Sequence, residues 1–544
     1  MRMIGILEAL MPLFVGAPLM LGAVLFVISN RHPLQPIIGL GTLLALLAGS
    51  GVLLAVTFDG TVLSHQIGLW PGGIAIAFVA DSFSSLILAA GAVVAVISFL
   101  YMMASGESQS PAIPALVLVL MGGVSGALLT ADLFNLFVFI EVMLLPSYGL
   151  LIFLSRRGEL GASRLYVVVN LLASTLFLAG VGLIYAVQGT VNMAALAGAG
   201  EDPATAIATA ISLAAIAVKA AVFPVHGWLA RTYAAASPAV AALFSGLHTK
   251  IAVYVVYRIS AVIFEGQSAW MLAILIFASL TLVIGAFAAL GENNMRSLMI
   301  FQMVSGIGFI LVGISLFTPL GLTSGIAYMV HHMIVMGALL LTVSAIEHTY
   351  GTGRLDQVSG LRAREKFVTA AFVIGSLSLV GLPPFSGFIA KYALVLASAD
   401  AGVVIVAGLL IVTSLLVLAS MMKIWAEVFN GKRETDVELL AARERIRTRE
   451  GLYDDESVSE EKVEQEAALA VEHIDPPRGI IGVDGDPHDH RGTRVSGLLI
   501  LPALMLGGLS VALGLGGEVL LQLAEQASNG LIDTSDYVKA VIGE

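Results

Sequence analysis

The sequence predicts an all-α polytopic membrane protein with about 14 transmembrane helices. Hydrophobic residues make up 58% of its 544 residues and charged residues only 12%, whereas soluble domains contain about 25% charged residues. Apolar runs of about 20 residues, long enough to cross a bilayer core, recur along the chain. The expected spans are 4–28, 34–57, 77–104, 112–130, 132–154, 161–187, 204–226, 238–263, 269–290, 296–316, 321–347, 367–398, 401–429 and 495–523.

The distribution of basic residues predicts how these spans are oriented. Lysines and arginines gather in alternate connections, and the other connections carry mostly acidic residues. Because basic residues mark cytoplasmic loops, both termini are expected outside the cytoplasm, in agreement with an even number of spans. Arg258, near the outer end of its span, is the main exception. The residues that follow the rule are Arg31, Arg156, Arg157, Arg164, Arg231, Arg296, Arg354, Arg362, Arg364, Lys366, Lys432 and Arg433.

One charged segment separates the transmembrane core, residues 1–430, from the final span and tail, residues 495–544. Residues 431–494 contain 17 acidic and 10 basic residues, so this stretch carries −7 of the net charge of −11. Its composition is typical of a solvated loop, and the orientation above makes that loop cytoplasmic. The Asp486–His490 stretch within it contains metal-ligating side chains. Such short clusters are usually only polar, so no metal site is predicted.

Several classes of cofactor are excluded by what the sequence lacks. There is no cysteine, which excludes disulfides, thiolate zinc sites and iron–sulfur clusters. There is also no nucleotide-binding loop of the Walker type and no basic patch typical of nucleic-acid binding. The sequence therefore predicts no cofactor and no nucleic-acid partner.

Prolines interrupt two expected spans in matching positions. Pro224 interrupts one, and Pro383 with Pro384 interrupts another. A proline removes a backbone donor and breaks a helix, and interrupted helices in corresponding positions of two halves are typical of an inverted repeat. Each is the fourth span in a block of five. The sequence therefore predicts two half-channels that meet at the membrane midplane, built from repeats at about 112–263 and 269–429.

Glu141 and Lys219 lie deep inside expected spans. A charged residue at the centre of a membrane helix costs roughly 2.5–3.5 kcal/mol on insertion scales, and such residues are rare unless they are paired or face water. Desolvation and a neighbouring carboxylate shift the pKa of a buried lysine in opposite directions. A lysine near a glutamate is therefore a plausible proton carrier. The structural alternatives are a locally bonded neutral Glu141 and a Lys219 held in a permanent ion pair.

Five further ionisable residues lie at membrane depth. Lys250 and His248 are two residues apart on a helix and face different sides. Lys250 is favoured for the main path, and His248 is equally well explained as a packed structural histidine. His331 and His332 are adjacent, and imidazole can shuttle protons near neutral pH. Lys391 follows the double proline on the outer side, which suits an exit to the exterior, although a snorkelling lysine is the alternative.

These residues and their flanking prolines also carry a family resemblance over about residues 70–430. The chain resembles the antiporter-like membrane subunits shared by respiratory complex I and the multisubunit Mrp sodium/proton antiporters, and among them it is most similar to the D-type subunits of bacterial Mrp antiporters. The motifs are specific, because glutamate and lysine at these depths beside these prolines rarely arise by chance. The matching stretches are Asn135–Pro146, Lys219–Arg231, Ser237–Tyr254, Tyr328–Leu340 and Gly381–Lys391.

The resemblance implies a fourteen-helix fold with inverted five-helix repeats. It also implies that Glu141 and Lys219 form a functional pair, that Lys250 and the His331 region connect the halves, and that Lys391 faces an exit channel.

The sequence departs from the family pattern at one central position. Met336 stands where related proteins often have a lysine. The relay at this point is then expected to use His331 or His332 with ordered water.

The midplane charges and the resemblance together predict a proton-translocating subunit of a multisubunit sodium/proton antiporter, and not an enzyme. Its expected location is the bacterial cytoplasmic membrane. Its expected partners are the other antiporter subunits, membrane lipid, protons and sodium ions. The alternatives are a proton-pumping subunit of a complex I-like NADH–quinone oxidoreductase or membrane hydrogenase, a non-conducting assembly subunit, and a carrier of a small anionic solute.

Overall fold

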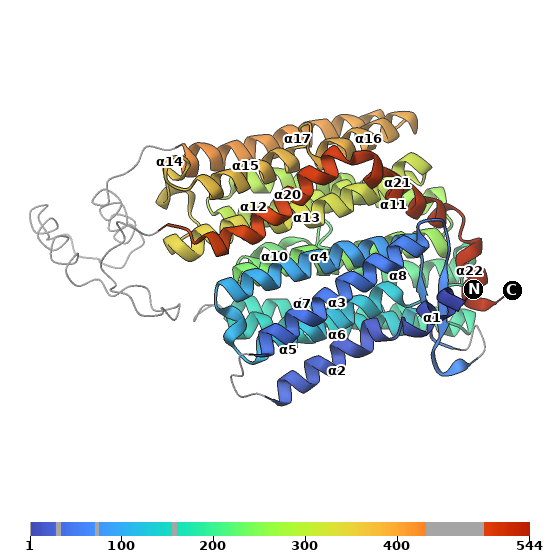
Figure 1. Cartoon of the computed structure of the whole chain (residues 1–544). Coiled ribbons are helices and arrows are strands. Elements are labelled where there is room, and N and C mark those ends of the chain that lie inside the picture. Colours follow the sequence, from blue (N-terminus) through green and yellow to red (C-terminus); the bar gives the residue numbers. More distant parts are fainter. Residues whose placement is uncertain (1, 29–33, 71–74, 155–159, 431–493, 544) are drawn as a thin grey trace, which may run out of the picture.

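The computed structural model describes residues 2–28, 34–70, 75–154, 160–430 and 494–543. In these ranges the protein is a bundle of long helices with one short β-hairpin (Figure 1). Twelve of the described helices are long and apolar enough to cross a membrane. The two remaining expected spans are each divided into shorter helices by a break. The expected loop at 431–493 lies outside the described residues, as do Arg31, Arg156, Arg157, Lys432 and Arg433.

The elements follow one another along the chain in four groups. The first group is α1 (Arg2–Leu10), α2 (Leu13–Val27), α3 (Leu34–Thr57), β1 (Leu63–Gln66), η1 (Ile67–Leu69), β2 (Ala77–Ala80), α4 (Ser82–Ala104) and η2 (Glu107–Gln109). The second is α5 (Ala112–Leu129), α6 (Leu133–Leu154), α7 (Leu160–Gln188), η3 (Ala199–Glu201), α8 (Pro203–Lys219), α9 (Gly227–Tyr233) and α10 (Pro238–Val262).

The third group is α11 (Ser268–Gly291), α12 (Met295–Leu316), α13 (Pro319–Tyr350), η4 (Leu355–Gln357), α14 (Leu361–Arg364), α15 (Lys366–Val380), α16 (Ser386–Asp400), α17 (Val404–Ile424) and the π-helical turn η5 (Trp425–Phe429). The last is α20 (Gly497–Leu515), α21 (Gly517–Ile532) and α22 (Ser535–Ile542).

The expected span at 77–104 begins too early. Residues 77–80 form β2, which pairs antiparallel with β1. The helix starts only at Ser82, because Asp81 caps it by accepting a hydrogen bond of 2.8 Å from the Ser84 N–H. An apolar strand of four residues cannot be distinguished from the first turn of an apolar helix by hydrophobicity alone.

Both predicted helix breaks are confirmed. The first lies between α8 and α9 and contains Pro224, and the second lies between α15 and α16 and contains Pro383 and Pro384. Proline cannot donate to a helical carbonyl, and the chain leaves the helix before it in both places. In the first break, the Phe223 N–H instead donates to the Thr281 hydroxyl of α11 at 3.0 Å.

Helices α10 and α13 form the centre of the bundle. Every residue in the apolar stretch of each is buried, whereas more than half of the residues in the apolar stretches of α11 and α17 are at least partly exposed. The 32-residue α13 packs against α10, α12, α16 and α20, and Figure 1 shows α20 in red along the yellow-green α13. Side chains on α10 and α13 therefore have neighbours from both halves of the chain.

The two ends of the bundle are each tied by a buried ion pair. Helices α1 and α22 lie at one end and α14 at the other (Figure 1). Arg258 of α10 pairs with Asp81 at 2.7 Å, and the Arg258 guanidinium also lies 4.7 Å from the ring centre of Tyr537 in α22. This pairing explains how Arg258 is tolerated away from the other basic residues. The second pair joins Arg296 to Glu347.

Candidate functional site

Lys219 ends α8, immediately before the first helix break. Its side chain is 6% exposed, and its ammonium points toward α7. There Nζ donates to the Ser174 hydroxyl at 2.7 Å and to the Asn170 carbonyl at 3.4 Å. Trp228 of α9 donates to the Val218 carbonyl at 3.0 Å and so holds the far side of the break against the end of α8.

Glu141 of α6 joins this group through Ser174. The Ser174 hydroxyl donates to Glu141 Oε1 while it accepts from Lys219. In the described part of the chain, no ion pair joins Glu141 directly to Lys219. The expected pair is therefore brought together, but one hydroxyl stands between its members. A hydroxyl can accept and donate at once, so Ser174 can pass a proton between the two groups.

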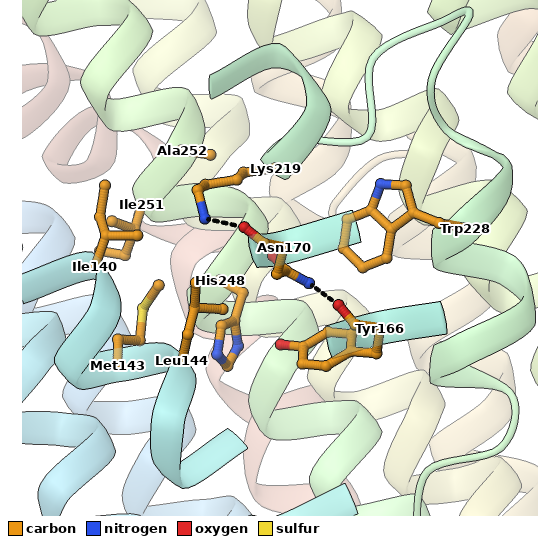
Figure 2. A pocket seen from close by; sticks show the side chains of 10 residues that line it. All are labelled: Ile140, Met143, Leu144, Tyr166, Asn170, Lys219, Trp228, His248, Ile251 and Ala252. Carbon is orange, nitrogen blue, oxygen red and sulfur yellow. Dashed lines mark hydrogen bonds between the residues drawn. The ribbon is translucent and has the colours of Figure 1, made fainter. Parts of the chain in front are cut away.

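A small pocket opens beside Lys219, as Figure 2 shows. Its volume of about 10 Å³ corresponds to roughly one water molecule. The residues with polar groups on its wall are Tyr166, Asn170, Lys219, Trp228 and His248, and apolar side chains of α6 and α10 complete it. The pocket therefore offers a place for a single water next to the lysine.

His248 faces the same region as Lys219, whereas Lys250 does not line the pocket. His248 Nε2 lies 2.6 Å from the Ser147 hydroxyl of α6, and its ring packs edge-on against Phe244 at 4.3 Å. Lys250 is fully buried, and its ammonium contacts the hydroxyl of Thr249 at 3.3 Å. The expectation that the two side chains face different ways is met.

The two adjacent histidines of α13 also diverge. His331 Nδ1 lies 2.8 Å from the Ser386 hydroxyl, at the first residue of α16. Neither ring nitrogen of His332 has a hydrogen-bond partner among the described residues, and its ring packs against Gly306 of α12, where a Cβ would overlap Nε2. Met336, one turn further on, is fully buried.

Lys391 of α16 lies among aromatic rings, with no carboxylate paired to it in the described ranges. Its ammonium donates to the Val380 carbonyl at 3.2 Å, at the end of α15. It lies 4.5 Å from the ring centre of Phe309 and 6.0 Å from that of Tyr328, and the negative faces of such rings attract cations. The two broken helices thus hold their lysines differently, because Lys219 reaches a carboxylate through a hydroxyl and Lys391 reaches a carbonyl and two rings.

Sequence reasoning misses the polar residues that link these groups. Ser174, Ser147 and Ser386 are buried serines in apolar helices, and such serines commonly bond only to their own helix. It also misses the role of Arg296, which the charge pattern marks only as a cytoplasmic residue. Arg296 donates to the Ala234 carbonyl at 3.0 Å while it pairs with Glu347, so it fastens the connection between α9 and α10 to α12 and α13.

The arrangement can pass protons but offers no evident metal site. Buried amines, imidazoles and hydroxyls and the half-buried carboxylate of Glu141 lie along α6, α7, α8, α10, α13 and α16, and each can gain, lose or relay a proton. Within the described ranges, no group of three or more histidine, aspartate or glutamate side chains is placed to hold a metal ion.

Known proteins with similar sequences and folds agree with this architecture. Residues 130–417 match the family model described as NADH:quinone oxidoreductase/Mrp antiporter, TM. The chain is 30% identical to the D-type subunit of the Na(+)/H(+) antiporter of Alkalihalophilus pseudofirmus over 97% of its own length and 98% of that protein. It is 29% identical to the Bacillus subtilis protein of the same name, over 91% of each chain.

Solved structures with similar folds point to the same family of membrane proteins. A chain in the structure of the Mrp complex from Dietzia sp. DQ12-45-1b superposes with a TM-score of 0.88 at 44% identity, covering 99% of this chain and 100% of that one. A chain of an archaeal membrane-bound sulfane sulfur reductase shares the fold, with a TM-score of 0.81 at 23% identity over 98% and 99% of the two chains. This chain therefore belongs to the NADH:quinone oxidoreductase/Mrp antiporter family of membrane subunits.

Proposed function

We propose that this chain is the proton-translocating subunit of a multisubunit sodium/proton antiporter in the bacterial cytoplasmic membrane. The observation that carries the proposal is the hydrogen-bonded line from the buried Lys219 through Ser174 to the half-buried Glu141. Placing an amine and a carboxylate at membrane depth is costly, and such groups mark ion and proton pathways. The names of the relatives, D-type subunits of Na(+)/H(+) antiporters in two bacteria, support the same function.

Protons are proposed to move along groups that change charge in turn. Loss of a proton at Lys219 removes its attraction for Glu141, and Ser174 transmits the change because it bonds to both. Lys250 and His332 then connect the first half to the second, since both are fully buried and their helices, α10 and α13, pack against each other. His331 and Lys391 complete the path on the side of the second helix break.

The same reasoning gives the proposed orientation and partners. Arg296, Arg354, Arg362 and Lys366 belong to or flank connections at the α14 end of the bundle, and this end is proposed to face the cytoplasm. Both termini then lie outside. The other subunits of the antiporter complex are the proposed partners, as in the Mrp complex from Dietzia to which this chain is similar. The chain is proposed to be a transporter subunit and not an enzyme.

Everted membrane vesicles test this proposal. Vesicles from cells that express the whole native gene cluster are energised to an acid interior, and sodium chloride is then added. Collapse of the pH gradient in these vesicles, and not in vesicles without the cluster, is the expected result. If sodium has no effect while the complex co-purifies with flavin and iron–sulfur subunits, the chain belongs to a redox-driven proton pump instead. Potassium chloride in place of sodium chloride reports the cation preference.

A further inference from the structure

A chain of four buried side chains crosses the second half of the bundle. His331 Nδ1 lies 2.8 Å from the Ser386 hydroxyl, which lies 3.0 Å from the Ser510 hydroxyl. Ser510 in turn lies 2.6 Å from the Ser378 hydroxyl. All four side chains are fully buried. The chain therefore runs from α13 through α16 and α20 to α15 without a gap.

These serines differ from most buried serines of this protein in what they bind. Ser125, Ser245 and Ser398 each donate to a carbonyl of their own helix, which is the usual arrangement in a helix interior. The three hydroxyls of the chain bond instead to one another and to the His331 imidazole. Each is therefore available both to accept and to donate a proton.

Helix α20, which carries Ser510, lies beside the second helix break. Gly514, one turn after Ser510, packs so closely on the break that a Cβ there would overlap the Pro384 carbonyl oxygen. At the other end of the chain, Ser378 lies two residues before Val380, whose carbonyl accepts the hydrogen bond from Lys391. The hydroxyls thus lead from the His331 imidazole to the break that Lys391 occupies.

We propose that Ser386, Ser510 and Ser378 relay protons between His331 and Lys391, so that α20 takes part in transport. The inference rests on the proposed function and adds three residues to its proton path. The Nδ1–H bond of protonated His331 breaks as an O–H bond forms on Ser386. Each serine passes its own proton to the next hydroxyl, and the last proton passes from Ser378 to the neutral Lys391 amine through one water. His331 ends neutral, Lys391 ends protonated, and every serine keeps one proton.

Two pairs of substitutions in the whole complex test the relay. Ser510→Ala is compared with Ser398→Ala, which removes an equally buried hydroxyl that bonds to its own helix. Ser378→Ala is compared with Ser376→Ala, which removes a buried hydroxyl on the same helix that has no partner among the described residues. The sodium-dependent collapse of the pH gradient is measured in everted vesicles after complex assembly has been checked. Whichever relay variant assembles decides the question.

We expect the antiport rate of either relay variant to fall about tenfold, because the lost hydroxyl slows the proton-transfer step. Both control variants should keep the wild-type rate. Ser510→Thr, which retains a hydroxyl, should recover most of the rate lost in Ser510→Ala. The ratio of rates in H₂O and D₂O should rise in the alanine variants, because proton transfer then limits the cycle.

The opposite pattern overturns the relay. A wild-type rate in either assembled alanine variant excludes it, and equal losses in Ser510→Ala and Ser510→Thr with an unchanged isotope ratio assign Ser510 to packing alone. Either result leaves the antiporter proposal standing if wild-type vesicles still respond to sodium. Absence of a response in the wild type means instead that the proposed function itself is wrong, and the relay with it.

Discussion

Lys219 and Glu141 are connected by a single hydroxyl. The Lys219 ammonium donates to Ser174 at 2.7 Å, and the same hydroxyl donates to the Glu141 carboxylate. The charges come from α8 and α6, and the bridge comes from α7, which lies between them in sequence. The hydrogen-bonded connection between the two charges therefore depends on a neutral residue that can be changed without altering either charge.

Ser174→Ala should lower the antiport rate by about tenfold, because it removes the side-chain bridge between amine and carboxylate and leaves each of the two groups one partner short. Ser174→Thr should retain activity, since it keeps the hydroxyl. The measurement is sodium-dependent dequenching of a pH dye in everted vesicles. The neighbouring Thr175→Ala is the control, because Thr175 is exposed and bonds to the Leu171 carbonyl of its own helix. Equal rates in Ser174→Ala and Thr175→Ala contradict the bridge.

Gly306→Ala should displace His332, because a Cβ at position 306 overlaps the imidazole Nε2. Overpacking of this kind costs about 1–3 kcal/mol, so the melting temperature of the purified protein should fall together with its transport rate. Gly408→Ala is the matched control, since a Cβ there meets no atom within 4 Å. Identical melting temperatures for the two variants would show that His332 does not pack against α12 as described.

Arg296→Met should destabilise the protein by about 3–5 kcal/mol, the usual effect of leaving one member of a buried ion pair alone. Glu347 would then be left buried without its partner, and the Ala234 carbonyl would lose its donor. Thermal unfolding in detergent measures the loss. Arg354→Ala, which breaks an exposed pair with Asp356 at 3.1 Å, should cost about 0–1 kcal/mol.

The double variant Arg296→Met/Glu347→Leu separates pairing from packing. It should regain part of the stability lost in Arg296→Met, because no unpaired charge remains buried. A double variant that is no more stable than the single one contradicts this account of the pair.

Glu107 should make the stability of the protein depend on pH. This residue lies in the turn between α4 and α5, where burial raises the pKa of its carboxyl to about 7, against the opposing effects of the Ser237 hydroxyl and Arg296. The folded state then binds this proton more tightly than the unfolded state. Its contribution to stability is therefore fully present below the ordinary pKa of 4.5 and is lost as the pH rises through 7.

A series of melting temperatures between about pH 5 and pH 8 checks this dependence. The wild type should lose stability as the pH rises, and Glu107→Gln should lose less. Glu518→Gln, at an exposed position in the first turn of α21, serves as the control and should follow the wild type. Parallel curves for all three proteins would rule out a raised pKa at Glu107.

The residues that carry charge can be found from the sequence, because a charge in an apolar span is costly and therefore conspicuous. This signal identifies Glu141, Lys219, Lys250 and Lys391. The prolines that precede α9 and α16 predict the helix breaks in the same direct way. These signals predict the broken helices and the helical membrane fold, and the structure confirms both.

The neutral links cannot be found in this way, because a buried serine has no distinctive sequence pattern. Ser174 becomes a bridge only when α7 lies between α6 and α8, and Ser510 meets Ser386 only because α20 packs on the second break. Arg258 stands out as an exception to the charge rule, but its partner Asp81 lies 177 residues earlier in the chain. Such pairings depend on tertiary packing and not on local pattern.

Removing the Lys219 charge tests the central claim most directly. Everted vesicles carrying the whole complex with Lys219→Ala are compared with wild type and with Lys366→Ala, which removes an exposed lysine at the start of α15. All three complexes are first shown to assemble to the same level. We predict that sodium collapses the pH gradient in the wild type and in Lys366→Ala but not in Lys219→Ala. An undiminished collapse in assembled Lys219→Ala would show that protons do not cross the membrane through this buried lysine.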